Sequence, residues 1–247
     1  MTTEISSTLL ADFPAVAHVI VDLPNELSDE LKITGSDGHH LVRVRRLRID
    51  EVVTAANGSG SWRPYRVVES SGRRLDLIAT AEVRVESPLT PPLRVAFSLT
   101  KGAKPEVVAR QLTELGVDSI IPVVADRSVA RPEAQSLVTR LQRVAREASM
   151  QCRRSWLPEC LAPVTFTEAI DLPGLVIASR TGTAATGKLN SQGWTLLVGP
   201  EGGFSPAEIA ALKSVPILAV GDLVLRAETA AVAGAAVLAT QRSRLVA

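Results

Sequence analysis

The stretch that decides the fold of the C-terminal part of this chain runs Leu196-Leu197-Val198-Gly199-Pro200-Glu201-Gly202-Gly203-Phe204-Ser205-Pro206-Ala207-Glu208-Ile209. Its apolar start predicts a buried strand, and the glycines that follow predict a loop whose backbone a ligand can approach closely. Ser205 and Glu208 match a capping box with Pro206 in the first turn, so the pattern predicts that a helix begins there. Because ligands of open α/β sheets bind beyond the carboxyl ends of strands, this loop is a candidate site.

The loop does not match the common nucleotide-binding motifs. It lacks the Gly-Lys-Ser/Thr of a Walker loop and the spacing of a dinucleotide fingerprint. It also carries an acid, Glu201, where a phosphate-binding loop would avoid negative charge. We therefore expect a ligand with little or no negative charge. The alternative is a purely structural turn followed by a capped helix.

A second stretch has the same strand-to-helix character and runs Val220-Gly221-Asp222-Leu223-Val224-Leu225-Arg226-Ala227-Glu228-Thr229-Ala230. It leads into an Ala-rich helix and places two charges, Arg226 and Glu228, in an otherwise apolar run. Charges in such surroundings need partners, so they indicate either a site or an internal ion pair. Since both stretches follow strands, we expect two adjacent loops that face one crevice.

Strands and helices alternate throughout the C-terminal part. Apolar runs predict strands at 93–99, 119–124, 175–179, 195–199 and 217–221. Amphipathic runs predict helices at 106–115, ended by Gly116, and at 136–153, with Leu137, Leu141, Val144, Ala148 and Cys152 on the apolar face. This alternation predicts an α/β domain with a parallel sheet covered by helices on both faces.

The N-terminal part has a different pattern. Short β-rich runs predict strands at 18–21, 51–54, 65–68 and 74–80, and the turn residues at 57–60 predict a hairpin. Ser36 or Asp37 is a candidate cap for a short helix with Leu41, Val44 and Leu47 on one face. We therefore expect a small β-barrel with one helix, and the proline-rich segment 87–92 is a stiff linker to the α/β domain.

The composition limits the class of protein. Of the 247 residues, 46% are hydrophobic and only 3% aromatic, and the net charge is +1. There is enough apolar material for a core, but too few aromatic residues for a single-strand binder that stacks many bases. Cys152 and Cys160 cannot by themselves build a metal cluster or a disulfide framework. We recognise neither a signal peptide nor a membrane-spanning run, so we expect a cytosolic protein.

Arginine supplies 22 of the 27 basic residues. Seven arginines and three acids lie from Asp126 to Arg154, and a second cluster contains Arg43, Arg45, Arg46 and Arg48. Such clusters suit phosphate contacts, which provide affinity without reading sequence. The alternatives are a G/C-rich coding bias for arginine and, for each cluster, an ordinary solvated face.

The motifs together resemble those of a known family. Gly199-Pro200-Glu201-Gly202-Gly203-Phe204-Ser205 followed by Leu225-Arg226-Ala227-Glu228-Thr229-Ala230 resembles the C-terminal signature of the ribosomal RNA small-subunit methyltransferase E family, of the SPOUT class. Three segments agree along nearly the whole chain: His39-His40-Leu41 with Val44-Arg45-Arg46-Leu47, Thr113-Glu114-Leu115-Gly116-Val117, and Glu147-Ala148 with Gln151 and Arg154. The chain departs from the family at Gln111, where Lys is frequent, at Met150, where a second Glu is frequent, and before His18, where an Arg is missing.

The resemblance implies a fold, a reaction and partners. The fold is a PUA-like RNA-binding β-barrel over residues 1–87, followed by a SPOUT methyltransferase domain with a trefoil knot over residues 88–247. The reaction is methylation of N3 of one uridine in 16S rRNA, with S-adenosylmethionine as methyl donor and without a metal. The partners are 16S rRNA or the small ribosomal subunit and a second copy of the chain, since the family forms homodimers with the site at the subunit interface.

The resemblance also implies roles for single residues. Cofactor contacts are expected at Gly199, Pro200, Glu201, Gly202, Gly203, Val220, Gly221, Leu223, Leu225 and Thr229, and RNA contacts at Arg43, Arg45, Arg46, Arg140, Arg143, Gln151 and Arg154. We assign Arg226 to catalysis because a nearby cation favours the deprotonated imide of uridine. Glu201 or Glu228 would accept the proton or orient the base.

Three alternatives remain open at this level. A non-catalytic RNA-binding or ribosome-assembly factor on the same fold would bind RNA but no methyl donor. An α/β enzyme with a nucleotide cofactor would need a phosphate-binding loop, which we do not find. A SPOUT methyltransferase with another RNA target would share the same motifs, because such targets are chosen by RNA shape and distributed contacts.

Overall fold

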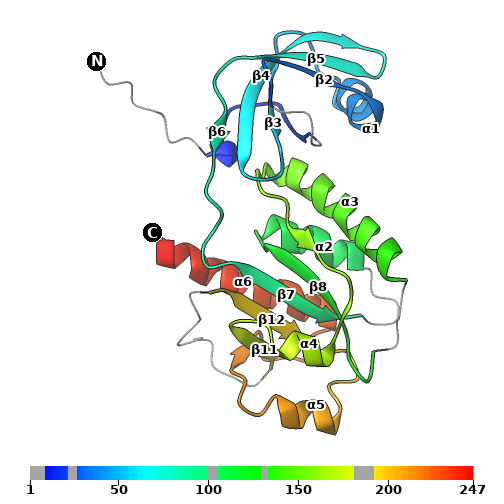
Figure 1. The fold of residues 1–247 in the computed structure, drawn as a ribbon, viewed down its shortest axis with the longest axis vertical. Coiled ribbons are helices and arrows are strands. Elements are labelled where there is room, and N and C mark those ends of the chain that lie inside the picture. The colour runs from blue at the N-terminus through cyan, green and yellow to red at the C-terminus, as the bar shows by residue number, and fades with distance from the viewer. Residues whose placement is uncertain (1–8, 22–26, 100–104, 129–132, 181–191, 247) are drawn as a thin grey trace. The chain divides into compact units, whose positions relative to one another are not determined.

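The computed structural model describes residues 9–21, 27–99, 105–128, 133–180 and 192–246. The chain divides into two compact units, each with its own sheet (Figure 1). The first unit comprises Met1–Pro88 together with Ser149–Leu157, and the second comprises Leu89–Ala148 together with Pro158–Ala247. A segment far along the chain therefore belongs to the N-terminal unit.

The first unit is a β structure with short helical turns. Its elements are η1 (Leu10–Asp12), β1 (Ala17–Ile20), β2 (Glu30–Ile33), α1 (Gly35–His39), η2 (His40–Val44), β3 (Val52–Ala56), β4 (Ser61–Ser71), β5 (Arg74–Ala79) and β6 (Arg84–Val85). The strand order is β1-β3-β4-β5-β2, with β6 beside β4, and only β1 and β3 pair in parallel. The predicted hairpin is confirmed as β3 and β4, while the sequence patterns did not predict β2.

The segment 149–157 is fastened to this sheet by hydrogen bonds. Leu157 N–H donates to the Gly58 carbonyl at 2.9 Å, and Trp156 Nε1 donates to the Glu86 carbonyl at 2.9 Å. Arg153 Nη1 donates to the Phe13 carbonyl at 2.6 Å. These bonds satisfy carbonyl groups that lie outside the strands of the sheet.

The short helix of the first unit differs from the prediction in two respects. It begins after Thr34 rather than at a cap on Ser36 or Asp37, and no side chain caps it. It then widens into the π-helical turn η2, in which Arg45 N–H donates to the His40 carbonyl at 2.9 Å. The longer turn changes the helical period, so Leu41 and Leu47 are buried while Val44 is exposed, which corrects the predicted apolar face.

The second unit contains a seven-stranded parallel sheet. Its elements are β7 (Leu93–Ser98), α2 (Pro105–Glu114), β8 (Ser119–Val124), α3 (Ala134–Cys152, whose last turn belongs to the first unit), β9 (Glu159–Cys160), β10 (Val164–Thr165), α4 (Phe166–Ile170), β11 (Leu175–Ser179), β12 (Trp194–Val198), α5 (Pro206–Ala211), β13 (Ile217–Ala219) and α6 (Ala227–Val246). The strand order is β10-β8-β7-β12-β11-β13, with β9 beside β8, and every pair is parallel.

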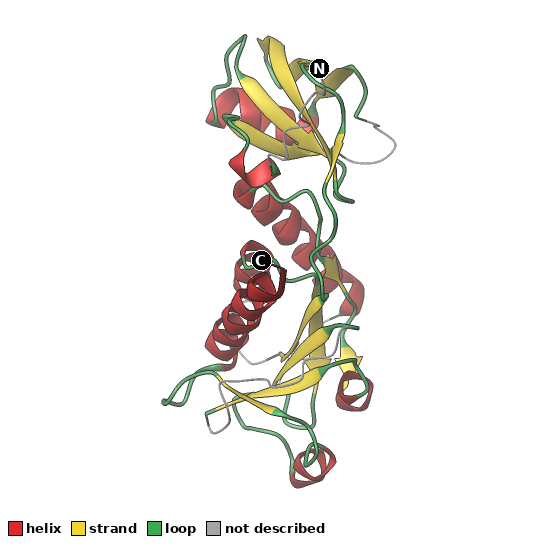
Figure 2. Cartoon of the chain, turned by 90° about the vertical axis from the view of Figure 1, so that its left-hand side faces the viewer, coloured by secondary structure: helices red, strands yellow, loops and turns green. Residues whose placement is uncertain are grey.

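Helices cover both faces of this sheet, as the sequence predicts (Figure 2). On one face, buried residues of α2, α3 and α6 pack against Val95, Leu196 and Val198. On the other face, α4 and the end of α5 pack against Ala96, Ile121 and Leu197. Alternate residues of each strand thus enter opposite cores, which explains why these strands are apolar throughout. No helix within the described ranges is long and apolar enough to cross a membrane.

The strand order corrects one prediction about the site. The loops that follow β12 and β13 are not adjacent, because β11 lies between these strands and pairs with both. Ile177 of β11 stands in register with Leu197 on one side and Ile217 on the other. Since all three strands are parallel, their carboxyl ends and following segments meet at one edge of the sheet.

Candidate functional site

The Gly-rich loop 199–205 has the predicted local structure. The Ser205 hydroxyl accepts from Glu208 N–H at 3.3 Å, and the Glu208 carboxylate accepts from Ser205 N–H at 2.7 Å, which completes the capping box of α5. Gly203 has a φ of 69°, a left-handed conformation that favours glycine, and its N–H donates to the Pro200 carbonyl at 2.8 Å. The loop is therefore a defined turn.

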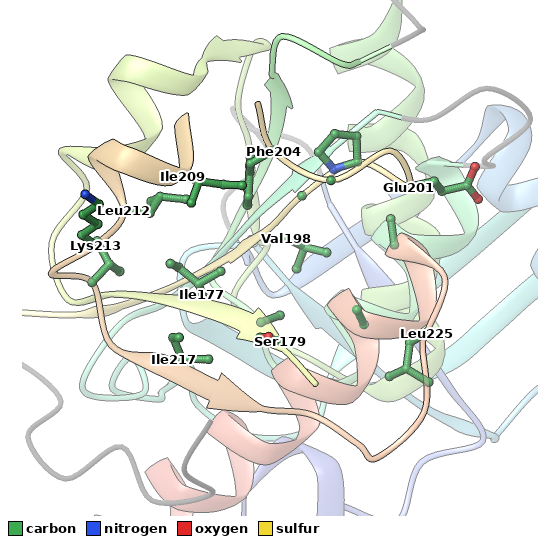
Figure 3. Close-up of a pocket in the computed structure, with 17 residues that line it drawn as sticks. Ile177, Ser179, Val198, Glu201, Phe204, Ile209, Leu212, Lys213, Ile217 and Leu225 are labelled. Atoms are coloured by element: carbon green, nitrogen blue, oxygen red, sulfur yellow. The ribbon is translucent and has the colours of Figure 1, made fainter. Parts of the chain in front are cut away.

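A cavity of about 490 Å³ opens beside this loop, in the size range of about 300–1,000 Å³ that is usual for small-molecule sites (Figure 3). The ends of β11 and β12, the Gly-rich loop, the segment from Ile209 to Ile217 and the start of α6 form its walls. These walls are mainly aliphatic. A Cβ added to Gly199 would lie 2.9 Å from the Phe204 ring, so glycine allows this ring to pack against the loop.

Half of the predicted cofactor residues line the cavity. They are Gly199, Pro200, Glu201, Gly203 and Leu225. The others do not line it: Gly202 accepts a hydrogen bond from Arg127, Val220 packs against the core, and Gly221, Leu223 and Thr229 are exposed.

The sequence patterns missed two parts of the cavity wall. One is the end of β11, where Ile177 and Ser179 line the cavity. The rule that ligands bind at strand ends could have identified it, because 175–179 was predicted to be a strand. The other is the segment after α5, which contributes Leu212 and Lys213 and carries no motif that indicates a ligand.

Of the three predicted catalytic residues, Glu201 lines the cavity, whereas Arg226 and Glu228, next to the lining residues Leu225 and Ala227, do not. Arg226 Nη1 is 4.0 Å from Glu228 Oε1, and the Arg226 side chain is 79% exposed. The other oxygen of Glu228, Oε2, is buried and makes no hydrogen bond within the described residues. Glu201 points away from the apolar middle of the cavity (Figure 3). The Arg226–Glu228 pair is thus a loose surface pair and not an internal one.

The arginines predicted to bind RNA lie on both units. In the first unit Arg43 and Arg46 are exposed, and Arg45 Nη2 donates to the Val16 carbonyl at 2.7 Å. The segment 149–157 of the same unit presents Gln151 as exposed and Arg154 as half-buried. On α3 of the second unit, Arg140 pairs with Glu106 at 2.8 Å and Arg143 with Glu147 at 3.1 Å, so acids partly balance this face. Arg131 lies outside the described residues.

Comparisons with known proteins agree on one group of relatives. A family model described as an RNA methyltransferase domain matches residues 86–239, and one described as an RNA methyltransferase PUA domain matches residues 33–80. The chain is 30% identical to a protein named ribosomal RNA small subunit methyltransferase E from Synechocystis, over 87% of this chain and 75% of that protein. It is 31% identical to the protein of the same name from Mycobacterium bovis, over 81% of this chain and 82% of that protein.

A solved structure shows the same fold. It is a ribosomal RNA small subunit methyltransferase E from Neisseria gonorrhoeae, bound to S-adenosyl methionine. The TM-score is 0.78 at 24% identity, and the match covers 91% of this chain and 97% of that one. A PUA-like unit followed by a SPOUT-type α/β unit is therefore the fold of this chain, as the sequence predicts.

Proposed function

Because the chain belongs to the ribosomal RNA small subunit methyltransferase E family, we propose that it transfers a methyl group from S-adenosylmethionine to small-subunit rRNA. The observation that carries the proposal is the cavity beside the Gly-rich loop at the ends of β11 and β12. This cavity lies where α/β sheets bind ligands, and its loop is glycine-rich without being a phosphate-binding motif.

The residues of the cavity fit this donor. S-adenosylmethionine has an apolar adenine face and no phosphate, and the aliphatic walls formed by Ile177, Val198 and Leu225 suit the former. Gly199 lines the cavity, and its lack of a side chain lets the Phe204 ring pack against the loop. When bound, S-adenosylmethionine supplies an electrophilic methyl group on a sulfonium, a chemistry that does not call for a metal.

We place the methyl group on N3 of one uridine in 16S rRNA, as the family resemblance implies. N3 carries a proton that must leave before or during transfer. The guanidinium of Arg226 would favour the deprotonated imide by charge attraction. Glu228 stands beside Arg226 and has a buried carboxylate oxygen without a hydrogen bond in the described structure, so we assign it to accept the proton or orient the base. Glu201 is the second candidate for that role.

We assign residues 1–87 to a PUA-like RNA-binding domain and residues 88–247 to the methyltransferase domain. Both domains would contact the rRNA. The exposed Arg43 and Arg46 and the arginines of α3 would contact phosphates. Such contacts hold the rRNA without reading its sequence, so the choice of uridine depends on RNA shape. We place the protein in the cytoplasm with its ribosomal substrate.

We further propose that the protein is a homodimer. Leu223 and Val224, in the loop before α6, are 77% and 90% exposed. Apolar side chains of this size beside a cavity favour burial by another surface, and a second copy would supply it. Light scattering should give a dimer mass, and replacing both residues by Asp should give a monomer. The trefoil knot implied by the family is part of this proposal. The return of α6 onto β7 and β12 is compatible with it, and an experimental chain trace would test it.

Calorimetric titration with S-adenosylmethionine tests the cofactor first, with ATP and NAD as controls. Binding of the methyl donor alone is the expected result. Binding of ATP or NAD instead would favour the nucleotide-dependent enzyme, and RNA binding without donor binding would favour the assembly factor.

Mapping of 16S rRNA tests the target. RNA from a strain that lacks the gene should lose one N3-methyluridine by mass spectrometry, and the purified protein should restore it on isolated small subunits or on free rRNA. A methyl group at another atom or on another RNA would contradict the proposed position.

A further inference from the structure

The turn that follows β8 reaches across the end of β7 to the Gly-rich loop. It is closed locally, because Ala125 N–H donates to Ser128 Oγ at 2.9 Å and Ser128 N–H donates to the Ala125 carbonyl at 3.0 Å. β8 and β12 are not neighbours in the sheet, since β7 lies between them. A contact between their following segments therefore depends on side chains rather than on strand pairing.

Three hydrogen bonds join this turn to the Gly-rich loop and α5. Asp126 N–H donates to Glu208 Oε1 at 2.9 Å, and the Ser205 hydroxyl donates to Asp126 Oδ2 at 2.6 Å. Arg127 Nη1 donates to the Gly202 carbonyl at 2.8 Å. Glu208 is only 4% exposed, and its two carboxylate oxygens accept from backbone N–H groups of two different loops.

Arg127 differs from Arg140 and Arg143 of the same basic stretch. Arg140 and Arg143 pair with acids on the helix surface, whereas Arg127 has no acidic partner within 4.0 Å in the described structure. Its guanidinium is directed instead to a main-chain carbonyl in the middle of the Gly-rich loop. Hydrogen bonds from a charged donor are stronger than neutral ones, so this bond is suited to hold a backbone that glycine leaves free.

The two ends of the loop are held differently from its middle. The strand β12 holds the start and the capping box holds the end. Between them Gly202 and Gly203 have no side chains to anchor the chain, and Arg127 supplies the anchor from outside. The cavity wall on this side is made of the same loop, at Glu201, Gly203 and Phe204.

We propose that Arg127, supported by Asp126, is a positioning residue that holds the Gly-rich loop in the conformation that binds the methyl donor. It acts through the Gly202 carbonyl, and it is not a catalytic residue. This inference rests on the proposed function for its ligand, but the loop conformation can be measured without one.

The experiment compares Arg127→Ala and Arg127→Lys with the wild type and with Arg110→Ala, an exposed arginine on α2, as the matched control. Hydrogen exchange of the amides 199–205 is measured without ligand, and the Kd for S-adenosylmethionine by calorimetry. For Arg127→Ala we expect faster exchange in this loop and a Kd raised about tenfold, the size expected for one lost charge-assisted bond. Arg127→Lys should show smaller changes in the exchange rate and in the Kd than Arg127→Ala. Arg110→Ala should change neither quantity. If Arg127→Ala does not fold, Asp126→Ala tests the same connection between the turn after β8 and the Gly-rich loop.

Three outcomes decide the matter. Unchanged exchange and unchanged Kd in a folded Arg127→Ala variant would overturn the inference and leave the proposed function standing. Weakened rRNA binding with a smaller salt dependence, but an unchanged Kd for the donor, would make Arg127 an RNA contact and would also overturn it. If the wild type binds no S-adenosylmethionine, the proposed function fails. The exchange rates then still show whether Arg127 holds the Gly-rich loop in place.

Discussion

The two loops that flank the cavity are held in opposite ways. The loop 199–205 is tied at its end by the capping box and in its middle by Arg127. The loop 220–226 occupies the same kind of position after β13, but Leu223 and Val224 face solvent. Its one charged contact within the described residues is the 4.0 Å pair of Arg226 with Glu228.

This difference suggests a division of roles. A loop whose polar groups are satisfied within the chain is already organised for a small ligand, and little ordering entropy remains to be lost on binding. A loop that exposes apolar and charged side chains is organised only when another surface covers it. We assign the first loop to the methyl donor and the second to the target RNA or the second subunit. Five predictions test this contrast.

The largest expected effect concerns Glu208. Glu208→Ala removes one half of the capping box of α5 and leaves the part-buried backbone N–H groups of Asp126 and Ser205 without their acceptor. We expect the free energy of unfolding of the second unit to fall by about 3 kcal/mol in urea denaturation. Glu208→Gln keeps acceptor oxygen and should lose less than half of that. Equal stability of the wild type and the two variants would show that the fold does not depend on the hydrogen bonds of the Glu208 carboxylate.

Arg226→Ala tests the open loop. We expect kcat to fall about 100-fold, the usual loss for one group that stabilises a developing anion. The Kd for S-adenosylmethionine should not change, because the side chain does not line the cavity. Arg226→Lys should keep part of the rate. A normal kcat for Arg226→Ala would remove this residue from catalysis.

The third prediction concerns the first unit. It asks whether a loss of stability of that unit at low pH leaves the loop 199–205 unchanged. Burial lowers the pKa of His18 from 6.5 to about 4, while its Nδ1 lies 2.9 Å from Thr54 Oγ1. In the unfolded chain His18 therefore takes up a proton below about pH 6.5, whereas in the folded unit it does so only below about pH 4. The stability of the first unit should be full above pH 6.5 and fall by about 2 kcal/mol at pH 5.

Unfolding experiments at pH 7 and pH 5 check this dependence. His18→Asn should show a flatter pH profile than the wild type. Neither loop contains a histidine, so exchange of the amides 199–205 should be the same at both pH values after correction for the intrinsic rate. A first unit that is equally stable at both pH values would contradict the expectation.

Gly199→Ala tests the wall of the cavity. The added methyl group would lie 2.9 Å from the Phe204 ring, so the ring must move. We expect a cost of about 1 kcal/mol and a Kd for the methyl donor raised about fivefold. Gly72→Ala is an unsuitable control because Gly72 has a φ of 61°. Ser214→Ala, on the exposed segment after α5, is a better one and should bind normally.

The smallest effect is expected in the open loop. Val224→Ser should change the free energy of unfolding of the isolated chain by less than about 0.5 kcal/mol, because its side chain is 90% exposed. Urea denaturation measures this free energy at protein concentrations below the dissociation constant of the dimer, where the chain is monomeric. A large loss would mean that Val224 is packed within its own chain and that the two loops do not differ as described.

The sequence by itself determined the local elements of this protein. The capping box at Ser205 and Glu208, the end of α2 at Gly116 and the apolar strands that enter two cores follow from neighbouring residues, and each was found within a residue or two. Local hydrogen bonds and hydrophobic period depend on spacing along the chain, so they can be read from it. The family motifs also located the Gly-rich loop and Leu225 at the cavity.

Only the tertiary structure decided what meets across the sheet. The order β12-β11-β13 separates the two loops that the sequence predicted to be adjacent, and it brings Ser179 to the cavity. The order β8-β7-β12 brings Arg127 within hydrogen-bond distance of Gly202, 75 residues away in the sequence. The π-helical turn that exposes Val44 belongs here too. Strand order and long-range hydrogen bonds are set by the packing of all elements at once, and such contacts leave no periodic trace in the residues that make them.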